Sequence, residues 1–316
     1  MKVIVLFFLC GAYIMASQNA VAQNTINIDT LKKNVPTKAF NQKQFVAASI
    51  QGGIITSTMI VLNKYWYAQY PKRKFGSFDD SKEWQQMDKM GHVFSAYLGS
   101  RLSAEIWKSA EINDTKSAWL GGLCGMLYQT AFEVMDGYSA EYGFSWADIA
   151  GNTLGATMFI TQQVAWQQQR IQPKLSYTTQ QYETSLQPRI KDLYGNTKQE
   201  RLLKDYNGQT YWLSVNLKSF APNTKLPAWL NIAVGTGASG MLGGFENKWT
   251  TNNIPYTRYD IPRQRQFYLA PDIDFTKIKT KKKGIKILFH MLNLVKLPTP
   301  GLELSGGKLK LRGIAY

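Results

Sequence analysis

Cysteine and histidine are scarce in this sequence, which contains two of each among 316 residues. Cys10 lies in an apolar run at the N-terminus and Cys124 in a later apolar stretch, so no pair is placed for an internal disulfide. There is no His-Glu-x-x-His zinc motif, no phosphate-binding loop ending in Lys-Ser/Thr, and no nucleic-acid-binding motif. These absences exclude a disulfide-stapled fold and give no support to the common motif-defined classes of enzyme or nucleic-acid-binding protein.

Acidic residues are also few, because 21 Asp and Glu stand against 37 Lys and Arg, giving a net charge of +16. Such a chain is attracted to anionic surfaces. Lys2, the apolar residues 3–9 and the small-x-small site at residues 20–22 are typical of a secretory signal peptide cleaved before Gln23; an uncleaved anchor helix is the alternative. We therefore expect an exported protein on the periplasmic side of the cell envelope, in contact with anionic membrane lipid and not nucleic acid. The sequence does not distinguish the inner from the outer membrane.

The rest of the chain divides by composition. Residues 23–43 and 171–204 are polar, and we interpret them as a flexible lead-in and a linker. Residues 44–170 predict four apolar helices, and residues 205–316 predict a smaller α+β region. The predicted fold is therefore mainly α, a four-helix membrane-associated bundle followed by that C-terminal region. The first helix, residues 45–62, reaches the lower length limit for a membrane span, and a buried helix of a soluble bundle is the alternative.

The C-terminal region mixes strand and helix patterns. Residues 211–217 and 263–275 alternate apolar and polar side chains and predict strands, and residues 302–311 predict a hairpin. Residues 285–296 predict an apolar helix with lysines on its flanks, which suits either an anionic membrane surface or a core position. The glycine-rich run 235–244 predicts a loop or close backbone packing.

Three pairs of polar residues interrupt the apolar helices: Asp88 with His92, Glu133 with Asp136, and Asp148 with Asn152. Each pair has i,i+3 or i,i+4 spacing, so each presents both groups on one helix face. The helix with the first pair is expected to begin with Asp80 or Ser81 as its N-cap. Three such faces meeting in one bundle would form a single buried polar cluster, where we place the function.

The cluster has a functional and a structural interpretation. In the functional one, His92 acts as an acid–base group that Asp88 orients, and Glu133 and Asp136, with Asp148, hold a cation or a water molecule. One histidine with several carboxylates suits Mg, Mn or Zn, with Glu133 and Asp136 as the metal pair.

The structural interpretation assigns each group a partner and no reaction. Ser145 and Asp148 resemble a capping box at a helix start. Lys89 would pair with a carboxylate, and Asn152 would form a hydrogen bond across helices.

The order and spacing of these residues resemble the YfiM/DUF2279 family of predicted bacterial envelope proteins. The resemblance covers about residues 45–165 and rests on three stretches: Asp88-Lys89-x2-His92-x4-Tyr97, Glu133-x2-Asp136-Gly137-Tyr138-Ser139, and Ser145-x2-Asp148-x3-Asn152-x2-Gly155. The pattern is also similar to VanZ-like membrane proteins, but this chain lacks the arginine that they carry between Glu133 and Ser145. The resemblance implies an envelope protein of unknown biochemical function.

We therefore expect a membrane-associated envelope protein whose buried polar cluster binds an ion, with a divalent cation as the candidate, or a polar lipid head group. The alternative is a hydrolase or transferase acting on a lipid-linked phosphate, with His92 as its acid–base group. The sequence leaves open whether the protein is an enzyme.

Overall fold

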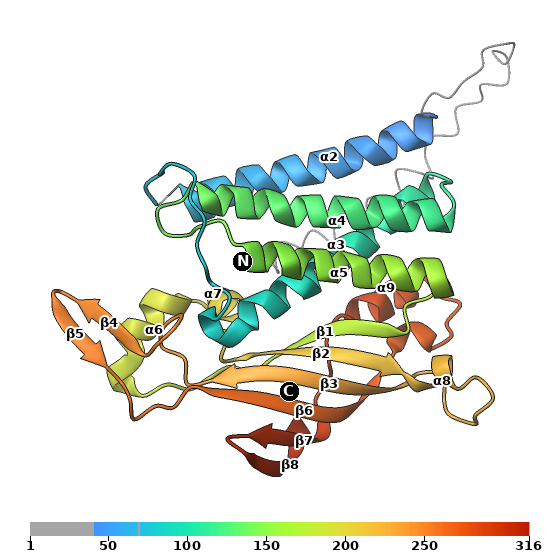
Figure 1. Ribbon diagram of the computed structural model, residues 1–316. Helices are drawn as coiled ribbons and strands as arrows, with labels where there is room; N and C mark the ends of the chain where they lie inside the picture. Colours follow the sequence, from blue (N-terminus) through green and yellow to red (C-terminus); the bar gives the residue numbers. More distant parts are fainter. Residues whose placement is uncertain (1–40, 69, 316) are drawn as a thin grey trace, which may run out of the picture. The chain divides into compact units, whose positions relative to one another are not determined.

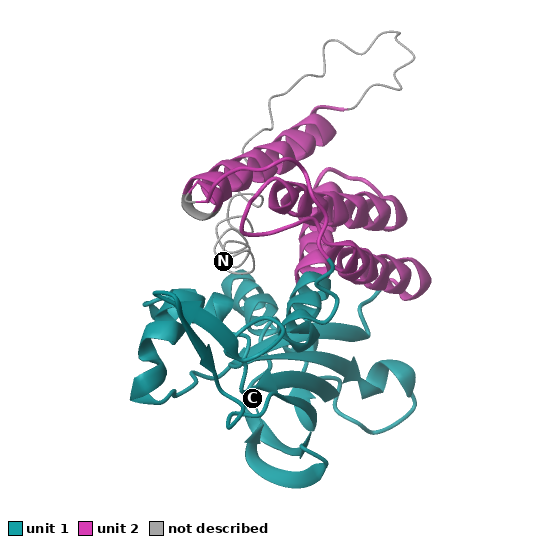
Figure 2. Ribbon diagram, turned by 60° about the vertical axis from the view of Figure 1, so that its left-hand side comes forward, with its two compact units in different colours: residues 1–4, 79–94, 168–316 teal, residues 5–78, 95–167 magenta. Residues whose placement is uncertain are grey.

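The computed structural model describes residues 41–68 and 70–315. The predicted signal peptide and nearly all of the predicted lead-in lie outside these residues. Within them the chain forms two compact units, each built from two separate stretches (Figures 1 and 2). We call residues 41–78 and 95–167 the helical unit, and residues 79–94 and 168–315 the sheet unit.

Four long helices dominate the first half of the chain: α2 (Gln42–Leu62), α3 (Met87–Ser109), α4 (Asp114–Gly137) and α5 (Trp146–Trp166), with the π-helix η1 (Asn63–Tyr67) after α2. The first two turns of α3 belong to the sheet unit. The helices α2, α4 and α5 begin where Asn41, Asn113 and Ser145 accept a hydrogen bond from a backbone N–H three residues on. The four expected helices are confirmed, but α3 begins at Met87, so the predicted start near Asp80 is wrong.

The backbones of α3 and α4 approach closely at two glycines of the helical unit. A Cβ on Gly121 would lie 2.6 Å from the backbone oxygen of Ser100, and a Cβ on Gly125 would lie 2.5 Å from the backbone nitrogen of Ser100. Any larger residue would push the helices apart, which is the close packing that the glycine spacing favours. A buried cluster lies beside this contact: Tyr97, Ala104, Ala118, Phe159 and Ile160.

One antiparallel sheet of six strands forms the centre of the sheet unit (Figure 1). Its strands, in spatial order, are β1 (Ile171–Tyr177), β2 (Gln209–Asn216), β3 (Leu230–Ser239), β6 (Gln264–Ile273), β7 (Thr299–Ser305) and β8 (Lys308–Ala315). A separate hairpin pairs β4 (Lys248–Thr251) with β5 (Ile254–Thr257). The unit also contains the short helices η2 (Glu83–Gln86), η3 (Thr184–Leu186), α6 (Gln187–Tyr194), α7 (Lys198–Lys204), α8 (Leu217–Phe220), η4 (Phe275–Lys277) and α9 (Lys283–Leu292).

The expectation of a mainly α chain is corrected to a mixed α+β fold, because a six-stranded sheet occupies the C-terminal half. The strands expected at residues 211–217 and 263–275 and the hairpin at 302–311 are confirmed as β2, β6 and β7–β8. Residues 171–204, interpreted as a polar linker, contain β1, η3, α6 and α7.

The glycine-rich run begins inside β3. The ring of Trp212 lies 2.6 Å from the position that a Cβ on Gly235 would take, so this glycine provides close packing within a strand. Of the two expectations for the run, close packing is the one that holds at Gly235.

Candidate functional site

The beginning of α3 carries the first predicted pair, within the sheet unit. His92 is buried, and its Nε2 lies 3.9 Å from Asp88 Oδ1, which is beyond hydrogen-bond range. Asp88 Oδ1 accepts instead from the Tyr206 hydroxyl at 2.6 Å. Lys89 is also buried; its ammonium donates to Asp80 and lies 3.2 Å from Asp88 Oδ2. The pairing of Lys89 with a carboxylate agrees with the structural interpretation.

Glu83 adds a third carboxyl group near this end of α3. Burial, followed by repulsion from Asp88 and Asp80, raises the pKa of Glu83 to about 7, against the attraction of Lys89 and an arginine. Three carboxyl groups therefore interact electrostatically around one buried lysine. Such an excess of acidic groups favours binding of a cation with oxygen ligands.

The turn in front of α3 is held in a left-handed conformation. Trp84, Gln85 and Gln86 have φ angles of 47°, 48° and 63°. Each L-residue adopts this conformation at a cost of roughly 1–2 kcal/mol, so other contacts must stabilise the turn. The Trp84 ring packs against Tyr206 with ring centroids 5.6 Å apart, and Tyr206 is the residue that binds Asp88. Backbone strain of this kind is often found at functional sites.

In the helical unit, α4 buries the second predicted pair. Glu133 is 1% exposed and Asp136 is 5% exposed. The hydroxyl of Tyr67, from η1, donates to Asp136 Oδ1 at 2.7 Å. No local pattern predicts this contact, because the two residues are 69 positions apart.

The third pair lies on α5, also in the helical unit. The Oγ of Ser145 accepts from the Asp148 backbone N–H at 3.0 Å, so Ser145 caps the helix as the structural interpretation expects. Asp148 and Asn152 lie one turn apart and are both buried. The backbone of Asp148 serves the cap, and its side chain is buried.

The structure therefore divides the predicted site residues between the two units. Asp88, Lys89 and His92 lie in the sheet unit. The others lie in the helical unit: Glu133, Asp136, Ser145, Asp148 and Asn152. The expectation that all three pairs form one cluster concerns both units and stays a prediction. Sequence reasoning missed Glu83 and Tyr206 because they lie outside the apolar helices that drew attention.

Residues 75–163 match the family model DUF2279, which is described as a predicted periplasmic lipoprotein. This segment belongs to the DUF2279 family. The DUF2279 segment covers less than a third of the chain, but it contains every predicted site residue. It includes neither α2 nor any strand of the six-stranded sheet. No curated protein and no solved structure matches the chain.

The DUF2279 description names the periplasm, in line with the expected export. It also names a lipoprotein, whose lipid is attached to a cysteine. The cleavage predicted before Gln23 would remove Cys10, the only cysteine near the N-terminus. Both residues lie outside the described part of the chain.

Proposed function

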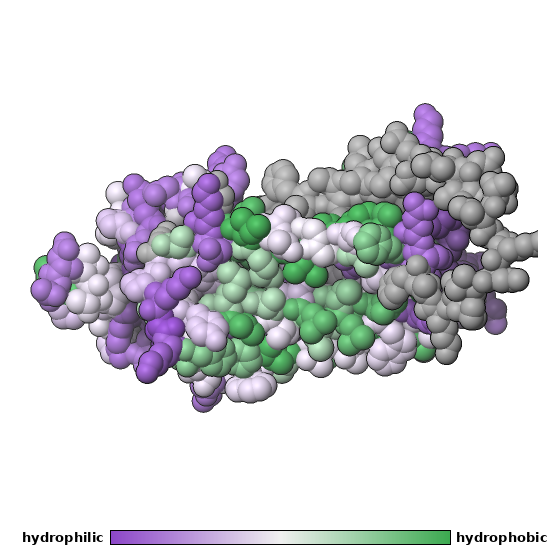
Figure 3. Space-filling view, turned by 90° about the horizontal axis from the view of Figure 1, so that it is seen from above, coloured by the Kyte–Doolittle hydropathy of each residue, from purple (hydrophilic) through white to green (hydrophobic). Residues whose placement is uncertain are grey.

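We propose that this protein is a membrane-embedded envelope protein whose buried polar residues bind a divalent cation. The observation that carries the proposal is the inverted polarity of the helical unit. Large apolar side chains on its helices face outward: Phe45, Ile60 and Val61 on α2, Trp119, Leu123 and Leu127 on α4, and Trp146 and Leu154 on α5. Polar side chains on the same helices are buried: Gln51 and Thr58, then Gln129, Glu133 and Asp136, then Asp148, Asn152 and Gln162. Figure 3 shows apolar side chains gathered on one face of the molecule between hydrophilic ends.

The dimensions of α2 support an embedded position. Its 21 residues span about 31 Å at the usual helical rise, close to the roughly 30 Å thickness of a bilayer's hydrocarbon core. By length and composition α2 can cross a membrane. A core helix of a soluble bundle would pass the same test but would be mostly buried, whereas only Ala47, Gln51, Thr58 and Leu62 of α2 are buried.

In a lipid environment, buried carboxylates point to a functional site. Ionisable groups inside a membrane protein are expensive to bury and usually mark a functional site. Glu133 and Asp136 lie one helical turn apart and nearly free of solvent contact, and oxygen ligands at this spacing suit a hard divalent cation. The sheet-unit carboxylates around Lys89 are the second place where the charge favours a cation.

The cation site is tested by titrating the detergent-purified full chain with Mn²⁺ and following free Mn²⁺ by its paramagnetic resonance spectrum. We expect the wild type to remove Mn²⁺ from solution and Glu133→Gln to weaken this at least tenfold, or about 1.4 kcal/mol, because the amide removes one charged oxygen ligand. Glu105→Gln is the matched control, because Glu105 lies in the same unit with 65% of its side chain exposed. Equal Mn²⁺ binding by wild type and Glu133→Gln, or none by the wild type, would refute the cation site.

The membrane position is tested separately by alkaline carbonate extraction of cell envelopes. An embedded protein stays in the membrane pellet, and a periplasmic protein bound only by charge is released. Release of the full chain would contradict the embedded position whatever the result with Mn²⁺.

The enzymatic alternative, with His92 as an acid–base group on a lipid-linked phosphate, stays a prediction. The 3.9 Å separation of His92 and Asp88 is longer than an orienting hydrogen bond.

A further inference from the structure

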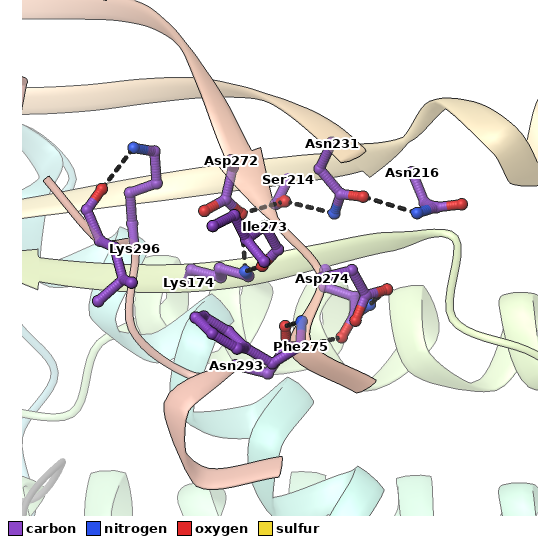
Figure 4. Close-up of polar contacts among 12 residues, drawn as sticks. Lys174, Ser214, Asn216, Asn231, Asp272, Ile273, Asp274, Phe275, Asn293 and Lys296 are labelled. Carbon is purple, nitrogen blue, oxygen red and sulfur yellow. Dashed lines mark hydrogen bonds and ion pairs between the residues drawn. The ribbon is translucent and has the colours of Figure 1, made fainter. Parts of the chain in front are cut away.

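The six-stranded sheet buries a network of polar side chains beside the apolar cluster Trp212, Ala233, Ala270 and Ala315 on its inner face, and it exposes apolar side chains on its outer face. Its inner face carries Lys174, Ser214, Asn231 and Asp272, each 2% exposed or less. Figure 4 shows these residues connected: Asp272 accepts from Ser214 at 2.6 Å, and Asn231 donates to Ser214 at 2.7 Å. Soluble antiparallel sheets show the opposite arrangement, with apolar side chains in the core and polar ones in water.

The ion pair on the inner face shows that the sheet curls around it. Lys174 lies on β1 and Asp272 on β6, three strands away in the order of the sheet, yet Lys174 Nζ lies 2.7 Å from Asp272 Oδ2. Across a flat sheet three strand spacings amount to about 14 Å, too far for these two side chains to meet. The polar face is therefore concave and sealed, and the opposite, outer face is convex.

The outer face is a continuous apolar surface set by strand register. One row of directly paired residues crosses five strands: Leu213, Val234, Leu269, Leu302 and Leu311. Their exposed fractions run from 39% for Leu302 to 79% for Leu311. A second row contains Phe267, Leu304 and Leu309, of which Leu309 is 68% exposed.

Near β2 the sheet unit covers part of this face itself. The ring of Phe94, from the first turns of α3, packs against Tyr211 with centroids 6.2 Å apart. From Leu213 to β8 the described residues of the sheet unit leave the rows open. Exposed apolar surface of this extent usually marks a binding surface.

The charge of the sheet unit favours anionic lipid as the occupant. Its residues 79–94 and 168–315 hold 25 Lys and Arg against 13 Asp and Glu, a net charge of +12. A second copy of the chain on this face would bring two positively charged units together, whereas anionic lipid head groups would attract them. Apolar residues facing outward and polar ones facing inward along alternating strands are typical of β-structure in contact with lipid.

We propose that the outer face of the sheet inserts into one leaflet of an anionic membrane. Rows two residues apart are separated by about 6.8 Å, so the rows reach much less far than the roughly 30 Å of the hydrocarbon core. Leu309 and Leu311 lie among acyl chains, and Lys308 and Lys310 point to the opposite side of β8, away from the bilayer. This surface is separate from the membrane contacts proposed for the helical unit.

The strand β8 provides its own matched control. Leu309 and Leu311 point outward, Lys308 and Lys310 point inward, and all four side chains are exposed. Single cysteines replace Leu309, Leu311, Lys308 or Lys310 in a chain in which Cys10 and Cys124 are changed to serine, and each receives a polarity-sensitive fluorophore. The full chain is placed in vesicles of phosphatidylethanolamine and phosphatidylglycerol, with and without nitroxide groups on the acyl chains. We expect blue-shifted emission and several-fold stronger quenching for the labels at Leu309→Cys and Leu311→Cys than at the two lysine positions.

Two results would overturn the proposal. One is equal quenching at all four positions or at none. The other is energy transfer between labelled chains in detergent, lost when unlabelled chain is added, which would identify a second copy as the occupant. A fifth label at Leu123→Cys, on the exposed face of α4, reports on the helical unit. Quenching at Leu123→Cys without the alternation on β8 would reject the sheet insertion and leave the proposed function intact. Alternating quenching on β8 without quenching at Leu123→Cys would support the sheet insertion and contradict the embedded position of the helical unit.

Discussion

Replacing Lys174 by methionine tests whether the interior of the sheet unit is held by its charged network. Lys174 is fully buried, and its ammonium lies 2.7 Å from both Asp272 Oδ2 and the carbonyl oxygen of Ile273. Methionine keeps most of the aliphatic stem, so the change removes the charge and its hydrogen bonds with little loss of packing. It leaves the Asp272 carboxylate buried with the Ser214 hydroxyl as a donor. Breaking a buried pair in this way destabilises by about 3–5 kcal/mol.

The measurement is urea unfolding of the detergent-purified chain, followed by tryptophan fluorescence. Lys174→Met combined with Asp272→Asn should recover part of the loss, because the double variant no longer buries an unpaired charge. Lys310→Met is the control, since an exposed lysine on β8 should change the free energy of unfolding by no more than about 0.5 kcal/mol. A loss below about 1 kcal/mol for Lys174→Met, or a double variant that loses the sum of the two single changes, would refute this account of the inner face.

Three further outcomes are expected. Glu83 has a pKa of about 7 in the folded chain against 4.5 in the unfolded chain, so the unfolded state loses its proton first and folding stability falls as the pH rises from 4.5 to 7. Glu83→Gln should therefore be more stable than the wild type at pH 8 by about 1–2 kcal/mol, after allowance for partial solvent screening, and equally stable at pH 4. Urea unfolding with a chelator present measures this difference, and a gain in stability that does not depend on pH would contradict the prediction. Gly121→Ala should lower the free energy of unfolding by roughly 1–3 kcal/mol, and with it the melting temperature, because the new Cβ would overpack against the α3 backbone. Gly53→Ala is the control: a Cβ there has nothing within 4 Å, so this variant should raise the free energy of unfolding by about 0.5–1 kcal/mol. A change of the same sign for both variants would be inconsistent with the α3–α4 contact. Intact-mass spectrometry of the exported chain should give a mature N-terminus at Gln23, and a lipid-modified Cys10 would show that the signal prediction is wrong.

Much of the secondary structure could be predicted from the sequence because it depends on local signals. The apolar runs identified all four long helices, and Ser145 three residues before Asp148 identified the cap of α5. The alternation in residues 211–217 identified β2. The strand β1 was missed because Gln172, Pro173 and Lys174 have the composition of a linker; they form a strand through partners on β2 and a buried ion pair far along the chain.

The candidate site was predictable only where helical periodicity applies. The spacing of Asp88 and His92 within one helix was readable, and both lie in α3. The partner of Asp88, Tyr206, is 118 residues away, beyond the reach of any local pattern. The left-handed turn at Trp84 was equally hidden, because its residues have side chains that ordinarily avoid positive φ.

The polarity of both units could not be predicted from the sequence. A period of two or 3.6 residues is the same whether the apolar side of an element faces the core or the surroundings. In α4, Leu123 and Leu127 share the helix with Gln129 and Glu133, and only the structure shows that the leucines are outside and the polar groups inside. The same inversion occurs in β2, where Leu213 is exposed while its neighbour Ser214 is buried. Two units of different architecture thus both carry exposed apolar and buried polar side chains, and this shared arrangement is the basis on which we propose that both contact lipid.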